Sequence, residues 1–548
     1  MSDITKVDTF TDPAPAKPGT GAASRFEHLC KFREPFLDRA RAVSKLTIPT
    51  EIPSEGHTPW EALSTPYQSA GSRGVSNLAS KLMMTLFPPN TPFFTLSVDE
   101  ALIAQAIEAS GEDPGEVETE IEQSLVGIER RVSEDIDRLH LRPALQRAFR
   151  HLVIGGNAMI NVPSNAQGRM IPLTRYVLNR DSMGRVVELL VFESIDPRTL
   201  RTEEQMAVVQ AEPGLRKKFE AGEPVALFTW AEATGVNDDG TLMFEQAQWI
   251  ENTKVPGTEA KYRADESEWI PLAINRADEE SYGRGAAEEF MGDLKTLEGL
   301  TRATVQGAAA AARVIFLVKP GSTARIRSLA SAPNGAFREG DPDDVGTLKL
   351  DKSADFAFAT NLMGSIESRL DEAFLVGKSV RRDAERVTAE EIAFMVQQLE
   401  DTQVGVYSTL AGSLQLAVVT RLMAMRRASG KDKDLQLLKR SVLQPKVIAG
   451  LEGLGRGHDL RRLQVAMSTL REFFGEQAVI QHINAGEGAK RVFNAAGVQP
   501  QGLLKTDEQV QQEQQAAMAQ QAVQAGIPNA VAGVAKATEN QPPVEPQQ

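Results

Sequence analysis

Apolar residues recur every three or four positions between Val117 and Leu139. This spacing places them along one side of an α-helix of about six turns. Directly behind it, Pro143 is a favoured residue in the first turn of a helix, and the pair Gly155-Gly156 favours a helix end. The first part of the chain is therefore predicted to be helical, with short helices and proline-rich turns before Asp99.

The middle of the chain is predicted to contain β-strands. Extended runs lie at residues 158–162, 171–178, 185–193, 225–230 and 241–250. The sequences at 181–184 and 237–240 contain residues that tolerate positive φ, so they join neighbouring runs into hairpins. Helical spacing returns at about Ala286 and continues into the small residues 308–312, which indicate either dense helix packing or simple helix propensity. The predicted fold class is α+β and mainly helical.

Size and composition indicate a folded protein with large cores. The 548 residues are 41% hydrophobic, a length that favours two to four compact units. No run of about 18 apolar residues is present, and the N-terminus lacks the pattern of a signal peptide, so nothing directs the chain to a membrane. The single cysteine, Cys30, excludes an intramolecular disulfide and a thiolate metal site, consistent with a reducing cytosol.

The net charge of −14 and the pI near 5.2 argue against a protein that grips nucleic acid over a broad surface. A channel through which DNA must slide needs few fixed cations. Each phosphate that a fixed cation of the protein neutralises adds affinity and therefore friction. The charge balance fits the passage of DNA better than its capture.

Residues 378–392 place a basic loop directly before a helix start. Thr388 and Glu391 have the S/T-x-x-E spacing of a capping box, so we expect the helix to begin at Thr388. From Ile392 onward, apolar residues follow the spacing of one buried helix face. By itself this pattern also describes a capped surface helix behind a charged loop.

Five segments, in this order and spacing, resemble the portal proteins of short-tailed phages of the autographivirus type, over roughly residues 25–510. They are Thr58-Pro-Trp-Glu61 through Gly71-Ser-Arg-Gly-Val-Ser-Asn-Leu-Ala-Ser-Lys-Leu-Met-Met84; Ser281-Tyr-Gly-Arg-Gly285 with Gly292-Asp-Leu-Lys-Thr-Leu-Glu298; Glu385-Arg-Val-Thr-Ala-Glu-Glu-Ile392; Leu399-Glu-Asp-Thr402 with Gly405-Val-Tyr-Ser408; and Gly450-Leu-Glu-Gly-Leu-Gly-Arg-Gly-His-Asp-Leu460. No single segment is diagnostic, but the set is specific.

The resemblance implies the portal fold of wing, stem, clip and crown, assembled as a dodecameric ring around a channel. The parts that it implies are a disordered tail at 1–24, the wing at 25–280, the first stem helix at 281–312, the clip at 313–361, the second stem helix at 362–376, the tunnel loop at 377–387, wing return helices at 388–487, the crown at 488–525 and a flexible tail at 526–548.

It also implies which cations meet DNA and which meet protein partners. In the tunnel loop the candidates for phosphate contact are Lys378, Arg381, Arg382 and Arg386. In the clip the candidates for partner binding are Lys319, Arg325, Arg327 and Arg338. For each tunnel-loop residue taken singly, an exposed solvated charge is an equal alternative. For the clip cations, the residues alone favour a plain charged loop.

The function that the resemblance implies is a ring at the unique head vertex, through which double-stranded DNA is packaged and ejected. The implied partners are the terminase large subunit, tail adaptor and tail tube proteins, scaffolding and major capsid proteins, and internal core proteins, with no membrane. The protein is expected in the virion after assembly in the host cytoplasm.

The sequence offers poor signals for catalysis. Residues 376–379 end like a phosphate-binding loop, but Glu372 stands where the first glycine belongs, and a helical pattern precedes the loop. The six histidines lack the close spacing of a metal site, so no cofactor, metal or catalytic residue is predicted. Two alternatives remain open at this point: another virion component, such as a tail or internal-core protein, and an α+β enzyme without a local motif.

Overall fold

The computed structural model describes most of the first 450 residues and little beyond them. It covers residues 21–88, 93–98, 114–200, 202–311, 315–320, 345–348, 353–376, 409–430 and 443–447, and the short pieces 331, 333, 343, 432, 435, 467–469 and 471–473. The chain divides into two compact units, Met1–Gly450 and Leu451–Gln548, and all elements named below belong to the first.

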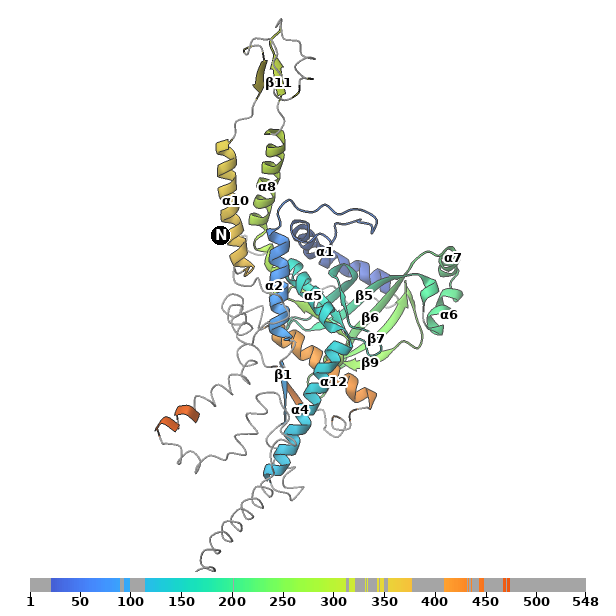
Figure 1. Ribbon diagram of the computed structural model, residues 1–548. Coiled ribbons are helices and arrows are strands. Elements are labelled where there is room, and N and C mark those ends of the chain that lie inside the picture. The colour runs from blue at the N-terminus through green and yellow to red at the C-terminus, as the bar shows by residue number, and fades with distance from the viewer. Residues whose placement is uncertain are drawn as a thin grey trace, which may run out of the picture. The chain divides into compact units, whose positions relative to one another are not determined.

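Long helices build the N-terminal part of the core (Figure 1). They are α1 (Ala22–Leu46), α2 (Ala70–Leu86), α4 (Pro114–Arg138) and α5 (Leu141–Gly155). The two helices predicted from apolar spacing and from the proline and glycine signals are confirmed as α4 and α5. The tail predicted at 1–24 is wrong at its end, because α1 begins at Ala22, which is fully buried.

The largest sheet has six antiparallel strands. They are β4 (Tyr176–Arg180), β5 (Val186–Ile195), β6 (Val225–Val236), β7 (Leu242–Ile250), β8 (Thr253–Lys254) and β9 (Ala260–Arg263), with both β8 and β9 paired to β7. Both predicted hairpin turns are confirmed, with Gly184 and Gly240 at φ 81° and 82°. Between β5 and β6 lie the short helices α6 (Glu203–Ala211) and α7 (Pro213–Ala221).

Helix α1 packs on this sheet. The Phe26 ring lies 5.7 Å from Phe192 and 5.4 Å from Phe228, centroid to centroid. Beside them, the buried Arg25 guanidinium donates to the Glu188 carboxylate at 2.6 and 2.9 Å. Because each ion satisfies the other away from water, this pair fixes α1 against β5.

Two smaller sheets join distant parts of the chain. One has the order β10 (Trp269–Ala273), β2 (Asn157–Asn161) and β3 (Arg169–Ile171). The other pairs β1 (Phe94–Val98) with β13 (Leu443–Val447). The strand predicted at 171–178 is wrong as a single element: a 3-10 turn, Leu173–Arg175, interrupts it, and Arg33 donates to three carbonyls there, those of residues 173, 174 and 176.

Two further long helices, α8 (Met291–Ala311) and α10 (Ser353–Ala373), flank the antiparallel strands β11 (Ile315–Val318) and β12 (Val345–Leu348) in the chain. The helix expected over 281–312 therefore starts at Met291, behind a short 3-10 turn at Ala286–Glu288. The helix expected over 362–376 starts at Ser353, so residues 353–361, which the resemblance places at the end of the clip, are helical. Finally, a π-helical turn at Ala411–Gln415 leads into α12 (Leu416–Ser429).

Candidate functional site

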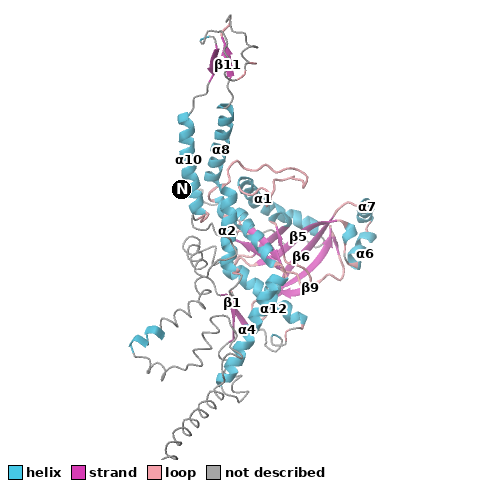
Figure 2. Cartoon of the chain, viewed as in Figure 1, coloured by secondary structure: helices cyan, strands magenta, loops and turns pink. Residues whose placement is uncertain are grey.

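Helices α8 and α10 form an antiparallel pair (Figure 2). Arg369 donates to Asp293 at 2.7 Å, Thr301 to the Met363 sulfur at 3.5 Å, and a methyl group on Gly307 would meet the Phe356 ring at 2.8 Å. Along these contacts the residue number rises on α8 as it falls on α10. At the Asp293–Arg369 end of the pair, Leu294 and Leu297 of α8 and Ile366 and Leu370 of α10 are buried in the main core. The two helices thus leave the core together as one hairpin.

The C-terminal end of α10 is fixed to α2. The Phe374 ring lies so close to Gly74 that a methyl group there would come within 2.5 Å of it. Asn77 donates to the carbonyls of Phe374 and Leu375 at 3.0 Å each, and the buried Lys81 ammonium donates to the Leu375 carbonyl at 2.7 Å. Burial lowers the pKa of Lys81. Since a helix end presents unpaired carbonyls, α2 supplies the donors that end α10 just before residue 377.

Helix α8 is held by a second contact with the segment that leads into α2. The Glu298 carboxylate accepts the backbone N–H groups of Tyr67, at 2.9 and 3.1 Å, and of Gln68, at 3.2 Å. One turn further on, the Arg302 guanidinium lies 5.8 Å from the centre of the Tyr67 ring. A carboxylate is favoured at this position because the N-terminus of α2 carries partial positive charge.

The segment 281–285 sets the place where α8 begins. The Tyr282 hydroxyl is buried and accepts the Leu178 N–H at 3.0 Å. The Asn157 side chain bonds both the N–H and the carbonyl of Gly283, each at 2.8 Å. A side chain on Gly283 or Gly285 would overlap the carbonyls of Ile274 or Ile154, so only glycine fits.

Two of the motif-bearing stretches identified in the sequence, 71–84 and 292–298, therefore meet α10 at the base of the helix pair, and 281–285 lies shortly before α8 in the chain. The capping role of Asn77 and Lys81 and the anchoring role of Glu298 were not predicted. The sequence signal was present, because all three residues lie inside these stretches, but nothing local shows which backbone groups they reach. The segments 385–392, 399–408 and 450–460 lie outside the described residues.

Charge on the hairpin is mostly negative on α10. Its exposed side chains include Asp355, Glu367 and Glu372, while its one cation, Arg369, is paired with Asp293. Of the predicted cations, Lys319 follows β11 and is exposed. The others, Arg325, Arg327 and Arg338 of the clip candidates and Lys378, Arg381, Arg382 and Arg386 of the tunnel-loop candidates, lie outside the described residues.

The buried ionisable groups elsewhere in the core serve packing. Glu51 accepts from Arg147 at 3.1 Å and Arg150 at 3.3 Å, and lies 3.2 Å from Nε2 of the fully buried His151. Burial acts to raise the pKa of Glu51, but its bonds to His151 and Arg147 and their charges outweigh burial and lower it to about 2. Desolvation lowers the pKa of His151. The cluster ties the segment after α1 to α5.

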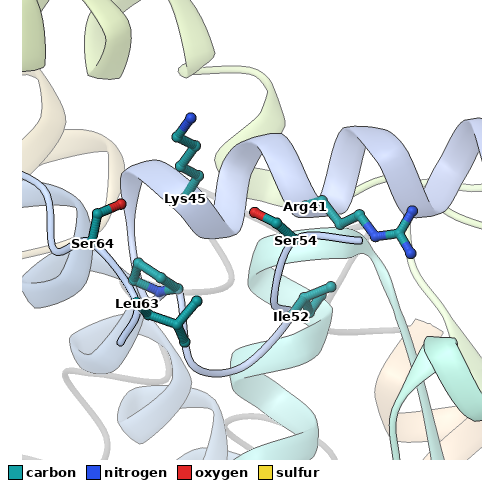
Figure 3. A pocket seen from close by; sticks show the side chains of 7 residues that line it. Arg41, Lys45, Ile52, Ser54, Leu63 and Ser64 are labelled. Carbon is teal, nitrogen blue, oxygen red and sulfur yellow. The ribbon is translucent and has the colours of Figure 1, made fainter. Parts of the chain in front are cut away.

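The described part of the chain contains one small hollow on the surface of α1. A small pocket lies between the last turns of α1 and the loop behind it, lined by Arg41, Lys45, Pro49, Ile52, Ser54, Leu63 and Ser64 (Figure 3). Across the described ranges, no group of three or more His, Cys, Asp or Glu side chains could bind a metal ion. Within the same ranges, no helix combines the length and the apolar character needed to cross a bilayer.

The described geometry is an antiparallel helix hairpin rooted in a body of helices and β-sheets. The family model for the bacteriophage head to tail connecting protein matches residues 20–504, and the chain belongs to this family. Its relatives include the portal protein of Escherichia phage T7, 33% identical over 538 residues, which are 96% of this chain and 95% of that protein. The portal protein of Enterobacteria phage T3 is 34% identical over 516 residues, 93% of this chain and 92% of that one.

The portal protein of Enterobacteria phage SP6 is more distant, at 28% identity over 520 residues, 93% of this chain and 95% of that one. Among solved structures, a chain from the neck of an empty gene transfer agent particle is 11% identical with a TM-score of 0.37, covering 83% of this chain and 94% of that chain. The family model and the sequence relatives together confirm the predicted resemblance to portal proteins of short-tailed phages.

Proposed function

We propose that the chain is the portal subunit of its phage: identical copies form a ring at the head-to-tail junction, and double-stranded DNA passes through the centre. The relatives named portal protein support the role. The observation that carries the ring is the α8–α10 hairpin, which is anchored firmly at its base and yet keeps large apolar side chains exposed in the single chain. Val305 is 51% exposed and Phe358 is 71% exposed. Such side chains favour burial against a neighbouring copy.

The number of subunits in the ring is proposed to be twelve, as the resemblance implies. In such a ring the hairpins form the channel wall, and the exposed acids Asp355, Glu367 and Glu372 give α10 a negative surface. A negative wall repels phosphate and therefore lets DNA slide instead of holding it.

The tunnel loop at 377–387 is proposed as the narrow point of the channel. The anchoring of residues 374–375 by Asn77 and Lys81 supports this assignment, because it fixes the point at which the loop leaves the wall. Four cations in the loop, Lys378, Arg381, Arg382 and Arg386, would contact phosphates briefly, since Asp383 and Glu385 dilute their charge.

The strands β11 and β12 and the cations near them are proposed as the docking region for protein partners. Lys319, with Arg325, Arg327 and Arg338, would meet acidic groups of the terminase large subunit during packaging and of the tail adaptor or tail tube proteins afterwards. Scaffolding, major capsid and internal core proteins would contact other parts of the ring. The subunit itself is proposed to carry no catalytic activity, so a separate motor ATPase supplies the energy for packaging. Assembly would take place in the host cytoplasm.

The ring is tested by light scattering of the purified chain, followed by negative-stain images of the same fraction. We expect a mass of about twelve subunits and a central hole. A compact monomer or dimer that persists with scaffolding protein present would contradict the proposal.

The tunnel loop is tested in phage that carry Arg381→Ala, Arg382→Ala and Arg386→Ala together. We expect intact rings with impaired packaging or retention of DNA, because the phosphate contacts are lost while the wall is unchanged. The matched control replaces three exposed arginines of the body, Arg130, Arg198 and Arg216, by alanine. Normal packaging and retention in the tunnel-loop variant would exclude this role for the loop.

A further inference from the structure

The loop between α1 and α2, residues 47–69, carries the most exposed large apolar side chain named in the described structure. Trp60 is 93% exposed, and Tyr67 at the end of the same loop is 50% exposed. An indole normally finds cover in a folded protein, because it buries more apolar area than almost any other side chain. Trp60 therefore points to a partner that is absent from the single chain.

The loop is ordered by its own contacts and does not need Trp60 for them. The N–H of His57 donates to the Ser54 carbonyl at 3.2 Å, and the N–H of Glu61 to the Thr58 carbonyl at 3.1 Å. The Glu61 carboxylate in turn accepts the Thr58 N–H at 3.2 Å. These bonds close a turn that presents Trp60 near its tip. Pro59 precedes Trp60 and has its φ fixed near the value that this position of a turn requires.

Two aliphatic side chains of the loop pack on its own chain. Ile52 and Leu63 line the small pocket against α1 together with Arg41 and Lys45 (Figure 3). Trp60 is not among the residues that line this pocket. The loop thus packs on its own chain through Ile52 and Leu63 and keeps the indole outside.

The loop meets α8 on the face that is turned away from α10. Glu298 and Gly307 are nine residues apart, and so are Asp293 and Arg302, a spacing of about two and a half turns that places each pair on opposite faces. Gly307 and Asp293 contact α10, whereas Glu298 and Arg302 contact Tyr67. The α1–α2 loop (Figure 1) therefore lies on the outer flank of α8.

The outer flank of α10 carries the complementary apolar surface. Phe358 is 71% and Leu362 is 38% exposed, and they lie one turn apart on the side of α10 opposite to Phe356, the ring that lies against Gly307 of α8. Arg369 stands further along the same side and reaches Asp293 of α8 with its long side chain. Thr301 of α8 contacts Met363 of α10, so these residues lie at the same height along the hairpin. The Arg302–Tyr67 contact on the outer flank of α8 is therefore level with Leu362 on the outer flank of α10.

Cyclic symmetry keeps all subunits of a ring at one height and brings one flank of each subunit to the opposite flank of the next. We infer that the α1–α2 loop of one subunit, through Trp60 and Tyr67, docks on the Phe358–Leu362 flank of α10 in the neighbouring copy. Tyr67 is already level with that flank. The chain from Tyr67 to Trp60 spans at most roughly 25 Å, so Trp60 stays within reach of the flank. This inference rests on the proposed ring, and it specifies which surfaces close it.

Fluorescence quenching tests whether Trp60 becomes covered. The other tryptophans, Trp230, Trp249 and Trp269, are buried or half-buried, so acrylamide should quench mainly Trp60 in dissociated subunits. The difference in quenched fluorescence between the wild-type protein and Trp60→Phe isolates the signal of Trp60. We expect this difference in quenching to be present in dissociated subunits and to disappear in assembled rings. An equally large difference in assembled rings would overturn the inference.

Cross-linking tests which surface covers it. In a Cys30→Ala background, Trp60→Cys and Leu362→Cys are combined and treated with a short bismaleimide. We expect a ladder of covalent oligomers on a denaturing gel. The matched control keeps Trp60→Cys but replaces Leu362→Cys by Met183→Cys, a position that is 77% exposed on the β4–β5 turn, and should give no ladder. Rings without a ladder in the first variant would refute the docking while leaving the ring itself intact.

The contribution to assembly is measured with Trp60→Ala in the full chain. We expect this variant to fold normally and to weaken each subunit contact roughly tenfold or more, since buried tryptophans are frequent hot spots of interfaces. Met183→Ala, which removes another large and mostly exposed apolar side chain, should have no effect. Unchanged ring stability with Trp60→Ala would contradict the inference, and a wild-type chain that forms no ring would overturn both it and the proposed function.

Discussion

The junction of α2 with α10 gives a sharp test of the packing, through Gly74→Ala. A methyl group at residue 74 would lie 2.5 Å from Cδ2 and 2.6 Å from Cγ of Phe374. Real Cβ atoms essentially never approach so closely, so either the ring or the helix must move. The ring has little freedom, since it is 1% exposed and packs on Phe290 with centroids 5.7 Å apart.

The size of the effect follows from two opposing terms. Replacing glycine by alanine inside a helix gains about 0.5–1 kcal/mol, because the unfolded chain loses freedom. Overpacking a rigid core site costs about 1–3 kcal/mol. The free energy of unfolding should therefore fall by up to about 2.5 kcal/mol, and the end of α10 should loosen where Asn77 and Lys81 hold it.

The assay is urea unfolding of dissociated subunits followed by circular dichroism. Gly364→Ala is the matched control, because Gly364 also lies in a helix and a methyl group there meets nothing within 4 Å. We expect the midpoint to fall with Gly74→Ala and to rise slightly with Gly364→Ala. A rise in both variants would show that α2 and α10 are not packed as described.

Two further predictions concern the anchors of the core. The pKa of Glu51 in the folded protein, about 2, is below its ordinary value of 4.5. Its carboxylate therefore stabilises the fold by roughly 3 kcal/mol above pH 4.5, and this stabilisation is lost as the pH falls towards 2. Glu51→Gln should therefore lower the free energy of unfolding at pH 7 and flatten its dependence on pH below 4.5; a wild-type pH profile in urea titrations would refute this. Glu298→Gln weakens the acceptor of the Tyr67 and Gln68 N–H groups and should cost about 1 kcal/mol in the same assay, with Glu367→Gln as an exposed control. Equal effects of the two substitutions would exclude an anchoring role for Glu298.

Local signals in the sequence determined several elements correctly. The three-and-four spacing behind Val117 fixed α4, and residues with positive φ at Gly184 and Gly240 fixed both hairpins. Each signal acts within a few residues, since helix period and turn geometry depend on the chain itself. The resemblance to portal proteins could also be identified from the sequence, because its five segments keep their order along the chain.

What the sequence did not show depends on residues far apart. The pairing of β1 with β13, and the Arg33 side chain that meets the interrupted strand at 173–175, come from segments that only the fold brings together. The roles of Lys81 and Glu298 are of the same kind, because a charged side chain shows its partner only once the partner backbone is in place. The sequence alone thus determined several of the elements and the family, and the tertiary structure decided how α8 and α10 are anchored and which of their flanks stay open. The physical reason is that periodicity is a local property, whereas burial and hydrogen-bond partners are set by packing across the whole chain.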